Sequence, residues 1–142
     1  MGIILVPMTM DHYEAVTALW RAAEGLWQSD DNEYDNMARF LARNPGLSQV
    51  SLEDGKVVGA VKCGHDGRRG YLHHLAVLPE YQHRGIGRAL VAACLARLRE
   101  EGITKVRCFV RDDNANALAF WRRVGFMEQA YDYRTMEFST DS

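Results

Sequence analysis

The segment Gln82-His83-Arg84-Gly85-Ile86-Gly87-Arg88-Ala89 is a glycine turn that could bind an anion. It lies between an apolar stretch and an amphipathic stretch, where a strand would lead into a helix. The first amides of a helix lack internal partners and carry the positive end of its dipole, and glycines let phosphate oxygens approach the backbone. Arg84 and Arg88 could add charge-assisted hydrogen bonds. Taken alone, the turn predicts a general anion site.

Two other phosphate motifs are absent from the sequence. It has no GxxxxGK[ST] loop, and no GxGxxG followed by the acidic residue that binds ribose in dinucleotide folds. A glycine at a strand-to-helix turn also relieves simple steric crowding. The turn therefore needs support from the residues around it.

A pair of histidines precedes the turn and could handle a proton. His73 and His74 lie in the apolar stretch that ends at Val77, and an imidazole titrates near neutrality. Neighbouring side chains of a regular strand point to opposite faces, so only one histidine should face the site, and a bulge could exchange them. We take His73 as the candidate general base, with Tyr71 as a further candidate on the same face. The alternative for both histidines is packing in a partly buried strand.

A polar segment, Trp27 to Asp35, follows the first predicted helix. Its carboxylates Asp30, Asp31 and Glu33 could attract a cationic amine, and Trp27 could form a wall against it. The alternative is a solvated acidic loop.

The apolar periodicity predicts the elements that must position these residues. Apolar side chains recur at three- and four-residue spacing in four segments, which indicates helices, and shorter apolar runs bounded by turn residues indicate strands. Glu53 to Lys56 has the composition of a tight hairpin turn. We expect strands near residues 3–6, 50–52, 57–61, 71–77 and 106–110, helices near 13–25, 34–43, 86–102 and 114–124, and further extended structure from Phe126 through Phe138. This order predicts one α/β domain over residues 1–142 with helices on a mixed sheet.

The composition limits the class of protein. The chain has 142 residues, of which 47% are hydrophobic and 25% charged, as in ordinary globular domains. The net charge of −2 gives no reason to expect nucleic acid as a partner. The cysteines Cys63, Cys94 and Cys108 form no CxxC pair, so we expect buried thiols and no metal. No apolar run approaches the roughly 18 residues that span a membrane, and we expect a cytoplasmic protein without a membrane partner.

The surroundings of the glycine turn resemble a known family. Leu75-Ala76-Val77-Leu78-Pro79 followed by Gln82 to Ala89 is similar to the acetyl-CoA motif of the GNAT superfamily of N-acetyltransferases, Gln/Arg-x-x-Gly-x-Gly/Ala after a V-x-P strand end. The second match, Asn114-x-x-Ala117-x-x-Phe120-Trp121-x-x-x-Gly125-Phe126, resembles the family signature Asn-x-x-Ala-x-x-Phe/Leu-Tyr ending in Gly-Phe. Together they cover about half of the chain in the order and spacing of the family.

The resemblance implies a fold and a cofactor site. The fold is α/β, a single GNAT-like domain with a mixed sheet of about six to seven strands and about four helices. The strand carrying Leu75, Ala76 and Val77 splays from the strand at residues 106–110, and acetyl-CoA lies in the cleft. The backbone of these three residues would bind pantetheine and polarise the thioester carbonyl. Residues 82–89 would hold the pyrophosphate, and Asn114 and Phe120 the arm near the sulfur. A helix cap is the alternative role of Asn114.

The resemblance also implies a reaction, the direct attack of a primary amine on the thioester of acetyl-CoA, without a metal. The position of His73 resembles strand histidines implicated as bases in the serotonin N-acetyltransferase branch. Trp121 stands where the family usually has a tyrosine thought to reprotonate the CoA thiolate. An indole donates a hydrogen bond but exchanges no proton, so Trp121 packs or donates only, and Tyr131, Tyr133 or water would supply the proton. Phe109 stands where the ribosomal-protein branch carries a glutamate base.

The acceptor and partners are less defined by the resemblance. The family builds its acceptor pocket from the segment after the first helix, which makes Trp27, Asp30, Asp31 and Glu33 candidate substrate-binding residues. The acceptor would be a small-molecule or peptide amine. Dimers are common in similar families, so a homodimer is one expected form. A non-catalytic acyl-CoA-binding sensor or interaction module is the alternative function, and the replacement of tyrosine by Trp121 is the argument for it.

Overall fold

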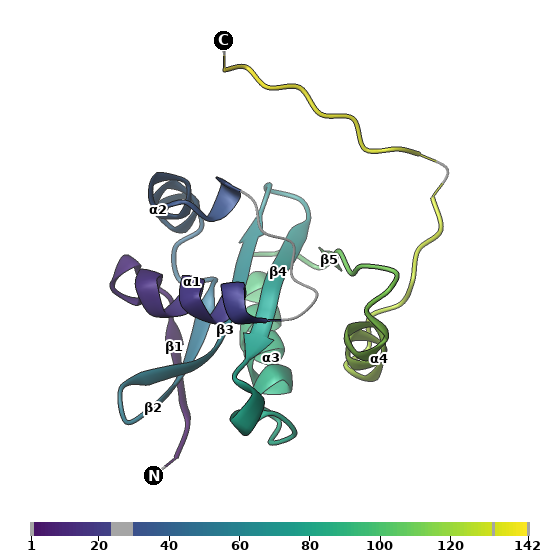
Figure 1. The fold of residues 1–142 in the computed structure, drawn as a ribbon. Coiled ribbons are helices and arrows are strands. Elements are labelled where there is room, and N and C mark those ends of the chain that lie inside the picture. The colour runs from purple at the N-terminus through teal and green to yellow at the C-terminus, as the bar shows by residue number, and fades with distance from the viewer. Residues whose placement is uncertain (1, 24–29, 132, 142) are drawn as a thin grey trace. The chain divides into compact units, whose positions relative to one another are not determined.

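A computed structural model describes residues 2–23, 30–131 and 133–141 (Figure 1). The described residues form two compact units, one ending at Arg111 and the other beginning at Asp112. The first unit contains a sheet and three α-helices. In chain order its elements are β1 (Ile4–Pro7), α1 (Tyr13–Ala22), α2 (Tyr34–Arg43), β2 (Gln49–Glu53), β3 (Lys56–His65), β4 (Gly70–Val77), α3 (Ile86–Glu100) and β5 (Val106–Cys108), with 3₁₀ turns η1 (Met10–His12), η2 (Asp30–Asn32) and η3 (Pro79–Tyr81).

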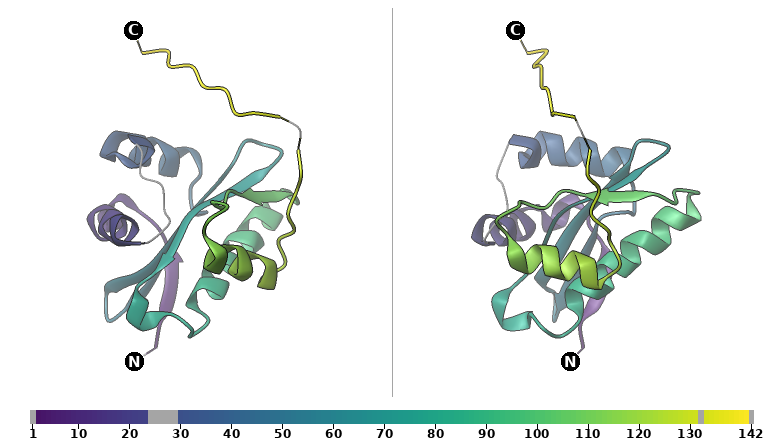
Figure 2. Two further views of the ribbon diagram at one scale, coloured as in Figure 1. Left: turned by 45° about the vertical axis from the view of Figure 1, so that its right-hand side comes forward. Right: turned by 90° about the vertical axis from the view of Figure 1, so that its right-hand side faces the viewer.

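The five strands follow the order β1-β2-β3-β4-β5 in one mixed sheet. The first four are antiparallel neighbours, whereas β4 and β5 are parallel and joined through α3. Asp54 and Gly55 form the β2–β3 turn with φ of 51° and 81°, as a two-residue hairpin of type I′ requires. Helices α1 and α2 cover one face of the sheet and α3 covers the other (Figure 2). The predicted helices and strands of this unit are thus confirmed.

Alternation along β3 separates the two cores of the first unit. Ala60 joins the core beneath α1, whose buried residues Val16, Leu19 and Trp20 follow i, i+3, i+4 spacing. Gly59 faces α3, because a Cβ at this residue would lie 3.2 Å from Leu90. From Ala60 on, side chains at even positions of β3 therefore point toward α1 and α2. Val57 packs against the same core, because a register shift against β2 interrupts the alternation between Val57 and Gly59.

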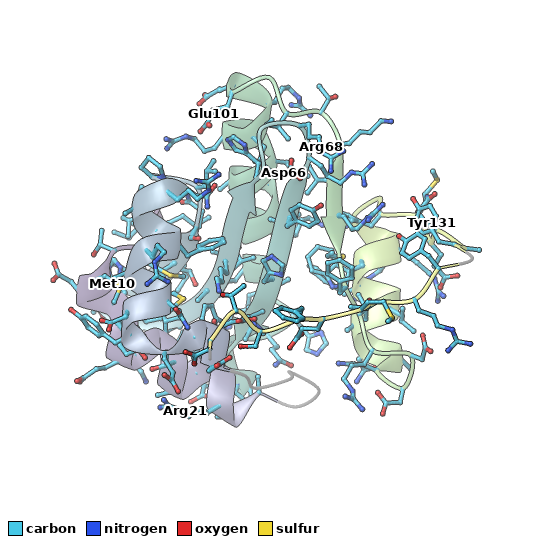
Figure 3. All side chains as sticks on the ribbon, turned by 90° about the horizontal axis from the view of Figure 1, so that it is seen from above. Met10, Arg21, Asp66, Arg68, Glu101 and Tyr131 are labelled. Carbon is cyan, nitrogen blue, oxygen red and sulfur yellow. The ribbon has the colours of Figure 1, made fainter. Side chains whose placement is uncertain are left out.

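The β3–β4 turn is fixed at the far end of the hairpin. Asp66 Oδ1 accepts hydrogen bonds from the amides of Arg68 and Arg69 at 3.0 and 2.9 Å, and these bonds lower the pKa of Asp66. His65 Nε2 lies 2.8 Å from Glu101 Oε1 at the end of α3. Asp66, Arg68 and Glu101 accordingly lie together at one end of the sheet (Figure 3).

The second unit contains α4 (Ala115–Arg123) and the segment that follows it. Asn114 caps α4, since its Oδ1 accepts from the amide of Ala117 at 3.0 Å. From Phe126 on, the described residues contain no strand, so the predicted extended pairing there is wrong. An extended chain becomes a strand only when its backbone pairs with a neighbour. The sheet of the described residues accordingly has five strands rather than six to seven.

The described residues include no helix that is both long enough and apolar enough to cross a bilayer. They also hold no group of three or more His, Cys, Asp or Glu side chains arranged to bind a metal ion. Cys63 and Cys94 are buried, as expected, and Cys108 is half-buried.

Candidate active site

Strands β4 and β5 diverge at the place where the candidate residues lie. They pair only from Gly70 to Leu72, although β4 continues to Val77, while β5 ends at Cys108. On that side, the backbone of β4 from His73 to Val77 has no strand partner among the described residues. A row of free N–H and C=O groups is a template for an extended ligand. Leu75, Ala76 and Val77, the predicted pantetheine-binding residues, are on this open edge.

The glycine turn gives α3 an open N-terminus. Gly85 is the N-cap with φ of 81°, a left-handed conformation that favours glycine, and no side chain caps the helix. The amide of Ala89 makes the first helical hydrogen bond, to Gly85 O at 3.0 Å. The amides of Ile86, Gly87 and Arg88 thus precede the helical ladder and have no acceptor within it. This arrangement fits the predicted pyrophosphate site.

The side chains of the turn hold its shape. Ile86 is buried and anchors α3, so that only its backbone is directed outward. Gln82 Nε2 donates to Val77 O at 3.1 Å, and an Arg84 guanidinium nitrogen donates to Glu80 O at 3.1 Å. His83 adopts φ of 64°, an uncommon conformation for a residue with a Cβ. The backbone of the turn therefore offers the clearest contacts for an anion.

A β-bulge in β4 places both histidines on one face of the sheet. Ala60 pairs with Ala76 and Lys62 pairs with His73, so β4 contains one more residue than β3 between these two pairs. Within this bulge His74 has a φ of 55°. The His73 ring lies 6.5 Å from that of Phe40 on α2, and the His74 ring lies 5.2 Å from Trp20 on α1. Regular alternation would have directed them to opposite faces, so the bulge is what brings both histidines to the face covered by α1 and α2.

Burial and nearby charge keep both histidines neutral. Burial, followed by the charges of Lys62 and His74, lowers the pKa of His73 from 6.5 to about 4, and Asp31 opposes this shift. The pKa of His74 is lowered by burial and by Lys62. The expectation that His73 titrates near neutrality is therefore wrong. Near pH 7 both imidazoles are available to accept a proton.

Lys62 is a buried cation that the sequence analysis missed. It is 6% exposed and pairs with His73 across the β3–β4 ladder. Its Nζ donates to Asn32 Oδ1 at 3.2 Å and lies 4.5 Å from the centre of the Phe40 ring. Burial lowers the pKa of Lys62, and Asp31 opposes the shift. A single lysine within the otherwise apolar strand 57–63 was the available signal.

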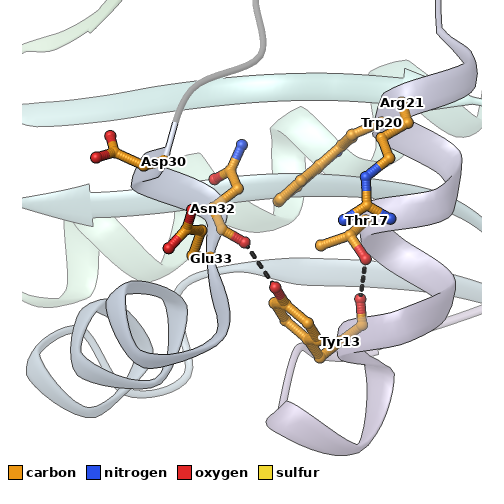
Figure 4. A pocket seen from close by; sticks show the side chains of 7 residues that line it. All are labelled: Tyr13, Thr17, Trp20, Arg21, Asp30, Asn32 and Glu33. Atoms are coloured by element: carbon orange, nitrogen blue, oxygen red, sulfur yellow. Dashed lines mark hydrogen bonds between the residues drawn. The ribbon is translucent and has the colours of Figure 1, made fainter.

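A pocket of about 290 Å³ lies between α1 and η2 (Figure 4). It contains two of the predicted substrate-binding residues, Asp30 and Glu33. Asp31 does not line it, but its charge acts on both histidines. Trp27 lies outside the described residues. The other lining residues were not predicted. Tyr13, Thr17, Trp20 and Arg21 come from α1, whose apolar spacing indicated packing alone, and Asn32 comes from η2, between the predicted residues Asp31 and Glu33.

The remaining predicted residues belong to the second unit. Asn114 caps α4, which bears out its alternative role. The Trp121 ring packs edge-on against Phe120 at 5.3 Å and against Phe126 at 4.9 Å. Tyr131 and Tyr133, the candidate proton donors, are exposed, and their rings stack at 4.9 Å. Their roles at the cofactor remain predictions.

Residues 13–126 match the Acetyltransferase (GNAT) family. The chain belongs to this family. It is 34% identical over 116 residues to an acetyltransferase of Pectobacterium atrosepticum, which covers 82% of each chain. It is also 34% identical over 119 residues to an acetyltransferase of Sodalis glossinidius, which covers 84% of this chain and 83% of the relative. The fold superposes with a TM-score of 0.82 and 18% identity on the PaiA N-acetyltransferase of Thermoplasma acidophilum in complex with coenzyme A, covering 93% of this chain and 94% of that chain.

Membership of the GNAT family identifies the activity and the kind of ligand that the first unit's site should bind. The family consists of acetyltransferases, so the resemblance drawn from the two motifs is confirmed and the chain is an acyltransferase. The open edge of β4 and the N-terminus of α3 suit the extended arm and the pyrophosphate of acetyl-CoA. The pocket is lined by residues of α1 and η2, and α1 covers the face of the sheet opposite to α3 (Figure 2).

Proposed function

We propose that this GNAT protein transfers the acetyl group of acetyl-CoA to a primary amine, and that residues 1–142 act as one GNAT domain. The observation that carries the proposal is the edge of β4 that has no strand partner in the described part of the chain, and that is connected through η3 and the glycine turn to the open N-terminus of α3. An extended ligand with an anionic end fits both features at once. The family match supports the same conclusion independently.

The residues that would hold acetyl-CoA are mostly backbone groups. Leu75, Ala76 and Val77 would bind the pantetheine arm, and residues 82–89 would bind the pyrophosphate through the first amides of α3. By the family signature, Asn114 and Phe120 would contact the arm near its sulfur. Acetyl-CoA supplies the acyl group as a thioester, which is activated toward attack by a neutral amine.

The histidine pair would handle the proton of the amine. An amine with a pKa of about 10.4 is neutral to about one part in 2,500 near pH 7, so a base assists the reaction. His73 or His74 would accept the ammonium proton, directly or through water, before the neutral amine attacks the thioester. As the N–C bond forms and the C–S bond breaks, the nitrogen loses a second proton through solvent, and the CoA thiolate that leaves is protonated from solvent. Since the pKa of His73 is about 4, it would hold the proton only briefly and pass it to solvent.

Thermal unfolding with acetyl-CoA tests the cofactor site. Acetyl-CoA should raise the Tm of the wild type, because a ligand that binds only the folded state stabilises it. Replacing Gly85 and Gly87 together by alanine should remove this shift. Gly55→Ala is the matched control, since Gly55 has the same φ of 81° and the same free space around its Cβ but lies in the β2–β3 turn. The absence of a Tm shift with any acyl-CoA would refute the proposal.

A non-catalytic acyl-CoA sensor is a second candidate, favoured by Trp121 in place of the usual tyrosine. Its indole is packed between Phe120 and Phe126 and cannot deliver a proton. A panel of amines, amino acids, peptides and polyamines assayed for CoA release separates the two functions. Turnover with any of them establishes the enzyme, whereas a Tm shift without turnover favours the sensor.

A further inference from the structure

We propose that the acceptor carries an α-amino-acyl group, an amine next to a carbonyl or carboxylate oxygen, and that Asn32 binds this oxygen. The proposal rests on the proposed acetyl transfer and narrows its substrate class. The pocket between α1 and η2 is the acceptor site in this view. Its volume of about 290 Å³ is at the lower end of small-molecule sites, which suits a group the size of one amino acid.

The position of the pocket connects it to the histidine pair. Trp20 lines the pocket and also contacts the His74 ring at 5.2 Å. His73 immediately precedes His74 in the chain and, because of the bulge, lies on the same face of β4. The pocket therefore adjoins the histidine pair through Trp20.

The buried contact with Lys62 fixes the orientation of the Asn32 amide. A protonated lysine amine only donates, so the atom of Asn32 that faces Lys62 Nζ at 3.2 Å must be the oxygen. The backbone of Asn32 is held as well, since its carbonyl accepts from the Tyr13 hydroxyl at 2.9 Å. The Nδ2 group must then point away from Lys62, and Figure 4 shows it directed into the space between η2 and Trp20.

The Asn32 Nδ2 group lacks an acceptor among the described residues. Asn32 is 8% exposed, and its Nδ2 is buried without a hydrogen-bond partner in the part of the chain described. Leaving a buried donor unpaired is costly, and native structures seldom do so without a functional reason. A ligand that presents an oxygen to Nδ2 would satisfy this donor.

The charges around the pocket supply the second half of the recognition. Asp30 and Glu33 favour a ligand with an ammonium group, whereas Arg21 favours one with a carboxylate or carbonyl oxygen. A polyamine would satisfy the carboxylates but leave the Asn32 Nδ2 group without an acceptor and place further positive charge beside Arg21. An α-amino-acyl group satisfies both sets, and it occurs in free amino acids and at the N-terminus of peptides.

The test measures kcat/KM for CoA release with a free amino acid, a dipeptide amide and a diamine that has no oxygen. Asn32→Asp keeps the oxygen that faces Lys62 and replaces only the free donor by an acceptor. It should lower kcat/KM for the better α-amino-acyl acceptor about tenfold or more, and leave that for the diamine unchanged or higher. Asn116→Asp, on the exposed face of α4, adds the same charge and should change neither. The Tm shift with acetyl-CoA checks that each variant is folded and binds the cofactor.

The outcomes separate this inference from the proposed function. Wild-type preference for either α-amino-acyl acceptor supports it, and the better of the two identifies whether a free amino acid or a peptide N-terminus is bound. A preference for the diamine, or an equal loss with all acceptors in Asn32→Asp, would overturn it while leaving acetyl transfer intact. If none of the tested amines led to the release of CoA, the proposed function itself would be refuted.

Discussion

The half-buried His73 of β4 should make the protein sensitive to mild acid. The pKa of His73 is about 4 in the folded protein, against 6.5 in the unfolded chain. Between these values the unfolded chain binds more protons, so the free energy of unfolding falls as the pH decreases. Above pH 6.5 the imidazole is mostly neutral in both states and costs little stability. As the pH falls from 6.5 toward 4, the free energy of unfolding decreases progressively.

The size of this effect follows from the two pKa values. At about pH 5, nearly every unfolded chain carries the His73 proton, whereas about one folded molecule in ten does. The resulting cost to stability is about 2 kcal/mol at pH 5, against about 0.2 kcal/mol at pH 7. This is a large part of the roughly 5–15 kcal/mol that stabilises a typical domain. Burial contributes most to the lowered pKa of His73; the charges of Lys62 and His74 lower it further, and Asp31 opposes them.

Urea unfolding at about pH 7 and pH 5 measures the effect, with tryptophan fluorescence as the signal. The wild type should lose about 2 kcal/mol more between the two pH values than His73→Gln, whose side chain does not titrate. His83→Gln, which removes an exposed imidazole from the glycine turn, is the matched control and should lose as much as the wild type. Equal losses in the wild type and His73→Gln would refute the reasoning. The loss that remains in His73→Gln includes that of His74, whose pKa is lowered too.

Three further predictions concern other parts of the molecule. Lys62→Met removes the charge that faces His73 and raises the pKa of His73, so the variant should lose less stability than the wild type between pH 7 and pH 5 in the same urea assay. Gly64→Ala places a Cβ 2.7 Å from the Phe40 ring and should lower the unfolding free energy by about 1–3 kcal/mol, measured by urea titration; an unchanged midpoint would contradict the close packing of α2 on β3. Trp121→Phe keeps the packing of α4 and should change kcat less than about threefold, because indole transfers no proton; a tenfold loss would assign Trp121 a polar role.

The framework of the site could be predicted from local patterns. The apolar periodicity gave the helices at residues 34–43 and 86–100 and the hairpin at Asp54-Gly55, because these depend on neighbouring residues. The glycine turn and its helix were also predictable, since Gly85 adopts the left-handed conformation that its type favours. The strand divergence came from the family resemblance rather than from periodicity.

The chemistry at the centre of the site depends on long-range contacts and was not predictable. Nothing in the residue types around His74 indicates a positive φ, so the sequence could not decide between a regular strand and a bulge. The hydrogen bond of the buried Lys62 to Asn32 joins residues 30 positions apart. The low pKa of His73 follows from the burial of His73 and, next, from the charge of Lys62, and both depend on the folded packing. The strands expected after Phe126 failed for the related reason that pairing, not composition, decides whether an extended chain is a strand.

The bulge at His74 also determines which backbone groups the open edge offers. Along a strand, the N–H and C=O of one residue point to one side and those of the next residue to the other, with a period of two. One additional residue shifts this period by half a cycle for everything downstream. Without it, Leu75, Ala76 and Val77 would exchange the groups directed at β3 with those directed outward. A single-residue deletion at position 74 would therefore leave the sequence of the cofactor motif intact and still invert its hydrogen-bonding pattern.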